Sequence, residues 1–173
     1  MLRPTDIPCL LSLRVHPRDS YGEMAARLGI SKSTAHGSVM RLVQNRLAHH
    51  SRQQLAIVAD GPALDLLCYG VPYAFAPDTV PEARGVATGL RALMNVAGYD
   101  TFSAALSLVW PSKLGEARGV GVTPLVAAAP EISYRDPVLY HMLAIVDALR
   151  MGDAREREFA RAAMQRAFKA LGA

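Results

Sequence analysis

Apolar residues recur at three- and four-residue spacing in several segments of the chain, and this spacing predicts amphipathic helices. The apolar positions of one such segment, residues 32–44, share a single helical face: Ala35, Val39, Leu42 and Val43. Ser20 and Ser31 stand where helix N-caps are expected, and Gly29 between them suits a turn of positive φ. The pattern predicts a helix from Ser20 to about Leu28, a tight turn, and a second helix after Ser31.

The segments on either side extend this pattern. A first short helix is expected in TDIPCLLSLRVHP, capped by Thr5 or Asp6 and closed by Pro17. After the second helix of the pair, RLAHHSRQQLAIVA contains two short runs around the polar tip Ser51-Arg52-Gln53. These runs predict a β-hairpin, although the tip lacks the Asn-Gly or Asp-Gly of a tight turn.

The middle of the chain is rich in glycine, proline and β-forming residues. Asp60-Gly61-Pro62 predicts a helix start and Gly70 its end, followed by strands at PYAFA (72–76), LSLVW (106–110) and ARGVGV (117–122). The sequence Glu-Ala-Arg-Gly-Val occurs twice, at 82–86 and at 116–120. This repeat predicts a duplicated hairpin-like element in which the Glu and Arg of each copy share one strand face and form structural ion pairs.

Two helices are expected at the C-terminal end. Asp136-Pro137 begins an apolar helix, VLYHMLAIVDALR, and Gly152-Asp153 ends it and caps the last helix, AREREFARAAMQRAFKA. The two form a helical hairpin. The chain as a whole predicts an α+β fold, with residues 1–60 as one domain and residues 61–173 as a mixed α/β region with C-terminal helices for packing, dimerisation or partner binding.

Composition supports a globular protein, since 51% of residues are hydrophobic and 20% are charged. No apolar run approaches the length that spans a bilayer, and the N-terminus lacks the features of a signal peptide. A soluble, cytoplasmic protein is therefore expected. Cys9 and Cys68 are far apart and flanked by leucine, which favours buried thiols over a disulfide or metal site.

The net charge of +4 is concentrated near the N-terminus. Residues 1–60 hold eight Lys and Arg against four Asp and Glu, together with four of the five histidines. A local basic field is the electrostatic footprint of phosphate binding, although clustered surface cations are also common in proteins that bind no anion.

Motifs of several enzyme classes are absent from the sequence. It contains no GxxxxGK[ST], GxGxxG, GxSxG or HExxH motif, and neither cysteine has a partner at metal-ligand spacing. The adjacent His49 and His50 would point to opposite faces of a strand, so one metal ion could not easily bind both. We therefore expect a protein that is not an enzyme and uses no cofactor or metal.

The residues EMAARLGISKSTAHGSVMRLVQNRLA resemble the winged helix-turn-helix of bacterial transcriptional regulators such as the MarR-type families. Small residues at Ala25, Gly29 and Ala35 allow the two helices to cross closely. The resemblance implies binding of double-stranded DNA by side chains of the second helix and the hairpin tip: Ser31, Lys32, Ser33, Thr34, His36, Arg41 and Arg52. Gly37 departs from this pattern, because it leaves a gap in the recognition helix. The alternatives are a helical pair used only for packing or protein contact and an Arg52 that is merely solvated.

A second resemblance covers the rest of the chain. GPALDLLCYGVPYAFAPD, LVWPSKLGEARGVGVTPL and RDPVLYHMLAIVDALRMGDARERE are similar to small winged-helix proteins that accompany nucleotidyltransferase-like toxins of the AbiE type. This resemblance implies an antitoxin-type repressor with such a toxin as a partner. Two hypotheses follow: a sequence-specific DNA-binding transcriptional regulator, or a protein-interaction module that binds a partner through its C-terminal region.

The last helix also predicts a homodimer. Its alanines allow close helix approach, and Phe159, Met164 and Phe168 offer more apolar area than covering one neighbour requires. A dimer would pair two recognition helices about 34 Å apart, one turn of DNA. The alternative is that this stripe packs onto Leu139, Leu143 and Val146 of the same chain.

Overall fold

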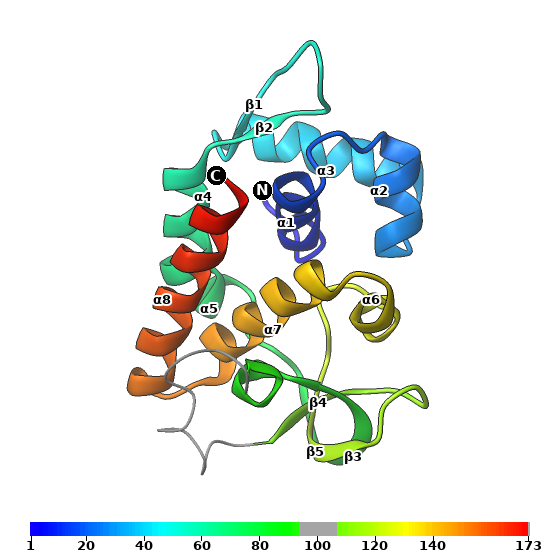
Figure 1. Ribbon diagram of the computed structural model, residues 1–173, viewed down its shortest axis with the longest axis vertical. Coiled ribbons are helices and arrows are strands. Elements are labelled where there is room, and N and C mark those ends of the chain that lie inside the picture. Colours follow the sequence, from blue (N-terminus) through cyan, green and yellow to red (C-terminus); the bar gives the residue numbers. More distant parts are fainter. Residues whose placement is uncertain (94–106, 173) are drawn as a thin grey trace.

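The computed structural model describes residues 1–93 and 107–172, and it confirms an α+β fold with a helical C-terminal end. Figure 1 shows α1, α2, α3 and the β1–β2 hairpin at one end of the molecule and the strands β3, β4 and β5 at the other. Helix α7 runs between these ends, and α4 and α8 lie along one side.

The N-terminal helices are α1 (Asp6–Val15), α2 (Tyr21–Leu28) and α3 (Lys32–Gln44). The predicted caps of α2 and α3 are confirmed: Ser20 and Glu23 form a capping box, and the Ser31 hydroxyl accepts a hydrogen bond from the Thr34 amide. Gly29 has φ 63° and ends α2 in the left-handed conformation, as expected. At α1, Thr5 precedes the helix without a side-chain cap bond, and Asp6 turns inward instead.

The predicted hairpin is present but short. Strands β1 (Ala48–His49) and β2 (Ile57–Val58) pair antiparallel, with Ala48 opposite Val58. The Ser51 hydroxyl accepts hydrogen bonds from the amides of Gln53 and Gln54, which folds the loop in place of a two-residue turn.

The next helical segment is longer than the sequence indicated. Helix α4 (Asp60–Asp65) continues through a π-helical turn, η1 (Leu66–Gly70), into α5 (Val71–Ala74). The prediction that Gly70 ends the helix and that a strand follows at 72–76 is therefore wrong. Pro72 lies directly after the π-helical turn, and the chain stays helical past it.

Three strands form a small sheet in which each strand pairs with the other two. They are β3 (Thr79–Thr88), β4 (Leu108–Pro111) and β5 (Ala117–Val122). Strand β5 has the predicted bounds, and β4 overlaps the strand predicted at 106–110, of which residue 106 lies outside the described residues. A 3₁₀ helix, η2 (Gly89–Leu93), follows β3.

The repeated sequence does not form two hairpins, and that prediction is wrong. Its copies lie on β3 and β5 and pair antiparallel with each other, Arg84 opposite Arg118. The ion pair that results joins Arg118 to Glu82 of the other copy at 3.9 Å on the exposed surface, while Arg84 donates to the Gly115 carbonyl. Gly85 allows close packing, because a Cβ there would lie 1.9 Å from the Trp110 carbonyl oxygen.

The C-terminal helices are α6 (Ala129–Arg135), α7 (Pro137–Met151) and α8 (Ala154–Leu171). The predicted caps are confirmed, since the Asp136 carboxylate accepts from the Leu139 amide and Asp153 forms a capping box with Glu156. Helices α7 and α8 pack against each other as the expected hairpin.

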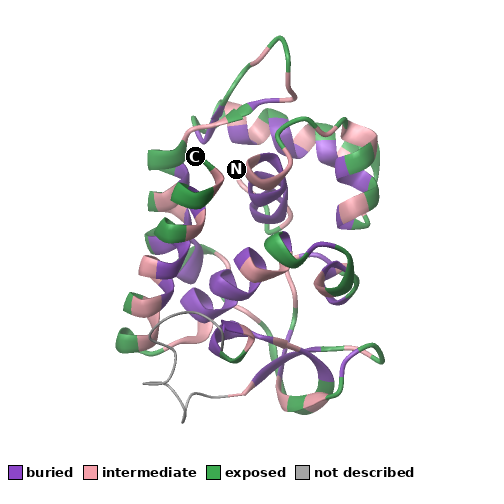
Figure 2. Ribbon diagram, in the orientation of Figure 1, coloured by how far each residue is buried: buried purple, intermediate pink, exposed green. Residues whose placement is uncertain are grey.

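One hydrophobic core joins the parts of the chain. Nearly every residue of α7 from Met142 to Arg150 is buried, and this helix contacts α1, α5, α8 and β3. Figure 2 shows the buried segments concentrated in α1, α7 and the inner faces of α3 and α8. Residues from both predicted regions, such as Leu10 and Leu143, belong to this core.

Candidate nucleic-acid interface

Helix α3 has one buried face and one exposed face. Ala35, Val39 and Leu42 are buried, which confirms most of the predicted inward stripe, and Val43 is half-buried. The exposed positions from the N-cap to residue 40 are residues expected to face DNA or their neighbours: Ser31, Lys32, Ser33, His36 and Met40. Thr34 is half-buried. The side chains of this face are polar or flexible, and they project from the end of the molecule that also carries the hairpin.

The first turn of α3 groups three hydroxyls. Ser31 Oγ lies 2.9 Å from Ser33 Oγ and 2.8 Å from Thr34 Oγ1, and it also caps the helix. This turn contains no acidic residue, unlike the first turn of α2 or α8. The partial positive charge of the helix N-terminus is therefore not neutralised by a carboxylate, which is the arrangement that binds an anion.

His36 lies on the exposed face one turn further along. Its ring meets the Tyr21 ring edge-on, with 5.1 Å between centroids. This contact joins α3 to the first residue of α2, so the imidazole is held in place at the surface rather than turning freely.

Arg41 does not project from the exposed face, contrary to the prediction. Its guanidinium turns toward α1 and binds the fully buried Asp6 carboxylate, with Nη2 2.7 Å from Oδ1 and Nε 2.9 Å from Oδ2. Burial alone would raise the pKa of Asp6, but the hydrogen bonds from Arg41, the Arg3 amide and Ser38 hold the pKa below its ordinary value. Arg41 therefore stabilises the packing of α3 on α1.

The same ion pair explains the glycine within α3. A Cβ at Gly37 would lie 3.3 Å from Arg41 Nη1, closer than an ordinary contact. Gly37, which had been read as a gap in the recognition surface, leaves room for the guanidinium to fold back along the helix.

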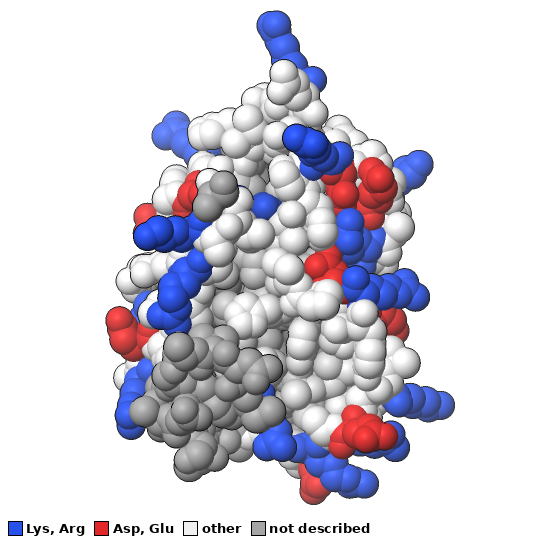
Figure 3. Space-filling model, viewed as in Figure 1, with Lys and Arg blue, Asp and Glu red and all other residues white. Residues whose placement is uncertain are grey.

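The stretch of sequence that contains α3 carries charges of one sign. Residues 24–59 contain five Lys and Arg and no Asp or Glu. Two of the five are paired with carboxylates elsewhere, Arg41 with Asp6 and Arg27 with Asp19 and Asp136. Within the described ranges, the other three have no ion pair and are exposed: Lys32, Arg46 and Arg52. In Figure 3 the tip above β1 and β2 carries Lys or Arg and no acidic side chain.

Arg46 is the one of these three that the sequence analysis missed. It lies two residues after the end of α3 and two residues before the start of β1, between the helix and the hairpin. The acid-free stretch of sequence was a signal that could have drawn attention to it. Its backbone conformation, described below, could not be read from the sequence pattern.

Ion pairs also connect this end of the molecule to α7. Asp136 Oδ2 lies 2.5 Å from His16 Nε2 and 3.2 Å from Arg27 Nη1, while its other oxygen caps α7. One carboxylate thus contacts the end of α1, the last turn of α2 and the start of α7. These contacts fix the orientation of α2 on the rest of the protein.

The side chains expected to form a dimer interface pack largely within the same chain. Met164 and Phe168 are buried, with exposed fractions of 0% and 2%, and Phe159 is half-buried. Leu139, Leu143 and Val146 are buried in the same core, which agrees with the alternative interpretation of this stripe. The homodimer stays a prediction, but these side chains no longer support it.

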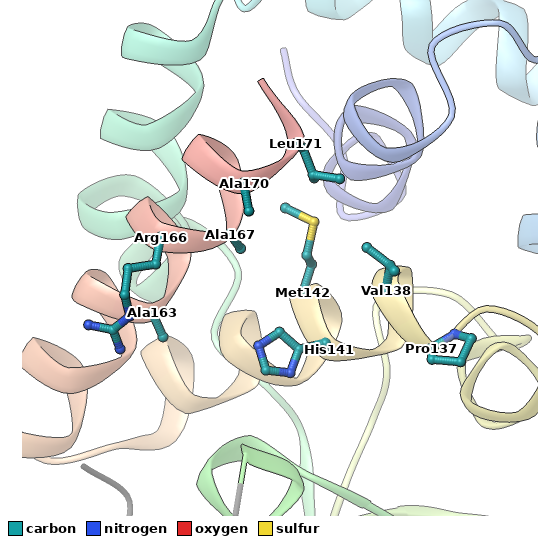
Figure 4. Close-up of a pocket in the computed structure, with 9 residues that line it drawn as sticks. All are labelled: Pro137, Val138, His141, Met142, Ala163, Arg166, Ala167, Ala170 and Leu171. Atoms are coloured by element: carbon teal, nitrogen blue, oxygen red, sulfur yellow. The ribbon is translucent and has the colours of Figure 1, made fainter. Parts of the chain in front are cut away.

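A shallow apolar cavity of about 590 Å³ lies between α7 and α8. Figure 4 shows Val138 and Met142 of α7 facing Ala170 and Leu171 of α8, with His141 below them. Burial lowers the pKa of His141. Arg166 of α8 also lines the cavity, and the rest of its wall is largely apolar.

Both cysteines are free and buried, as expected, and burial raises the pKa of each thiol to about 11. Among the described residues, no group of three or more His, Cys, Asp or Glu is placed to hold a metal ion. No helix in this part of the chain is both long and apolar enough to cross a membrane.

Comparison of the chain with protein-family models, with curated proteins and with solved structures finds no match in any of the three.

Proposed function

We propose that the protein binds double-stranded DNA through a winged helix-turn-helix, with α3 as the recognition helix and the β1–β2 hairpin as the wing, and that it acts as a transcriptional regulator of the antitoxin-repressor type. The observation that carries the proposal is the surface of α3: a polar exposed face, an N-terminus without carboxylates, and exposed unpaired cations at both ends and on the hairpin.

The dimensions of helix α3 suit the major groove of DNA. An α-helix fits this groove, and its N-terminal residues then face base edges and phosphates. Lys32 and the amides of the first turn would bind phosphate, Ser33 and His36 would reach base edges, and Arg52 would contact phosphate or the minor groove. Thr34 lies beside them, and Ser31 serves chiefly as the helix cap. Arg41 is left out of this interface because Asp6 binds it.

We expect the substitution Ser33→Asp to weaken DNA binding at least about tenfold, because it places a carboxylate where a phosphate would lie. The same change should stabilise the folded protein by about 0.3–1 kcal/mol, because an acidic residue in the first turn of a helix interacts favourably with the helix dipole. Fluorescence anisotropy with a duplex selected from a random pool would measure the first effect, and thermal unfolding the second.

Ser33→Ala is the matched control, since it removes the hydroxyl without adding charge and should change binding far less. Wild-type affinity in the Ser33→Asp variant would place DNA elsewhere on the protein.

The alternative function, binding of a partner protein such as a nucleotidyltransferase-like toxin, has one observation in its favour. Tyr69 and Tyr73 are more than half exposed, and each ring stacks under an arginine of α8, Arg161 and Arg157 respectively. Exposed tyrosine and arginine are typical of energetically important interface residues. A full-length chain that binds no duplex at low salt would favour this second function.

A further inference from the structure

Arg46 has an unusual backbone conformation. Its φ is 61°, and among the residues that the structure describes it is the only non-glycine residue with a positive φ. The Arg46 amide donates to the Val43 carbonyl at 3.0 Å, and the Leu47 amide donates to the Leu42 carbonyl at 2.9 Å. This is the Schellman arrangement that ends a helix, and its left-handed position is usually glycine.

A side chain at this position strains the backbone. For an L-residue the left-handed conformation brings Cβ too close to the following carbonyl oxygen, whereas glycine adopts it freely. The same chain uses glycine at the end of α2, where Gly29 has φ 63°. Strain retained at a single position is a reason to look for a function of that side chain.

Nothing in the described parts of the protein compensates for the strain. Arg46 is exposed, and the side chain makes no hydrogen bond, ion pair or ring contact with any residue in the described ranges. The nearest acidic residue on the N-terminal side in the sequence is Glu23 and on the C-terminal side Asp60, and Asp60 pairs with Arg14. The Arg46 side chain therefore adds no described contact that stabilises the fold, and glycine would adopt this backbone conformation with less strain.

Its position is that of a phosphate contact. Arg46 comes two residues after the end of α3, while Lys32 begins the helix. Thirteen helical residues span about 20 Å, more than the width of the major groove, which is about 12 Å. A helix lying in the groove can thus bring a cation at each end near the sugar-phosphate backbones that border the groove.

We infer that Arg46 binds a backbone phosphate of duplex DNA from the junction of α3 and the hairpin, and that the strained conformation is retained because the guanidinium is needed there. The inference rests on the proposed function, and it adds a contact that the helix-turn-helix pattern did not indicate. A phosphate contact carries no sequence information, so Arg46 contributes affinity and register rather than specificity.

The substitution Arg46→Gly tests this inference, because its two effects have opposite signs. Relief of the strain should raise the melting temperature of the full-length protein by about 2–4 °C. Loss of the guanidinium should weaken binding to a selected duplex about five- to tenfold at moderate salt. It should also make the slope of log affinity against log salt shallower by about one.

Two further variants separate charge from conformation. Arg46→Lys keeps the charge and the strain, so the salt slope should stay that of the wild type. Arg46→Asn adopts the left-handed conformation more readily and lacks the charge, so its binding should resemble that of Arg46→Gly.

Wild-type affinity and salt slope in Arg46→Gly would overturn the phosphate contact. A lower melting temperature in that variant would overturn the argument from strain. A wild-type protein that binds no duplex at all would instead overturn the proposed function, which keeps the two failures distinct.

Discussion

Replacing Asp147 by alanine is expected to lower the free energy of unfolding by about 3–5 kcal/mol, because it leaves the buried Arg150 without its partner. Arg150 Nη1 lies 2.7 Å from Asp147 Oδ1. The other carboxylate oxygen accepts from Trp110 Nε1 at 2.6 Å and from Thr88 Oγ1 at 2.8 Å. Burial raises the pKa of Asp147, and these donors oppose that shift. The carboxylate thereby joins α7 to β3 and β4.

Urea denaturation would measure this loss, and Trp110→Phe provides a milder variant in case Asp147→Ala does not fold. That change removes one donor and should cost about 1–3 kcal/mol. The double variant Asp147→Leu with Arg150→Met should be more stable than Asp147→Ala, because it removes both charges together. Equal stability of Asp147→Ala and the wild type would show that the network contributes nothing to the fold.

Replacing Arg41 by alanine is expected to destabilise the protein by about 3 kcal/mol, because Asp6 would then be a buried charge without a cation. The sequence pattern instead predicts that Arg41 is exposed and contacts DNA, in which case its replacement would hardly change stability. Lys32→Ala is the matched control, since it removes an exposed cation from the same helix and should alter stability by no more than about 0.5 kcal/mol. Chemical denaturation of the two variants at neutral pH would decide between these roles.

The pH dependence of stability gives an independent check on this ion pair. The pKa of Asp6 is lower in the folded protein than its ordinary value, so the ionised carboxylate stabilises the fold above the unfolded-state pKa, about 3.9. That contribution is lost as the pH falls through the lower folded-state pKa. In Arg41→Ala burial is no longer opposed by the guanidinium, so acid unfolding should begin at a higher pH. An identical acid transition in both proteins would contradict the account.

The local features of the fold were predictable from the sequence, because they depend on a few neighbouring residues. Ser20, Ser31, Asp136 and Asp153 cap helices as expected, and Gly29 makes the turn. Capping needs only a side-chain oxygen close to free amides, so its signal lies within four residues. The exposed face of α3 follows from the same helical spacing.

Two of the failures concern contacts between distant residues. The repeat at 82–86 and 116–120 gave no indication that its two copies pair with each other, because register depends on the whole sheet. Arg41 was assigned to the surface by helical spacing alone, and only the position of Asp6, 35 residues earlier, shows otherwise. Arg46 was missed because its importance comes from a dihedral angle.

The most direct test of the central claim is the affinity of the full-length protein for a duplex selected from a random DNA pool, measured as a function of salt. With phosphate contacts from Lys32, Arg46 and Arg52, the slope of log affinity against log salt should be about −2.7 or steeper. Binding should also be tighter to the selected sequence than to an unrelated duplex. Failure to bind any duplex at about 50 mM salt, or an affinity that does not change with salt, would contradict the assignment of α3 and the hairpin as a DNA-binding surface.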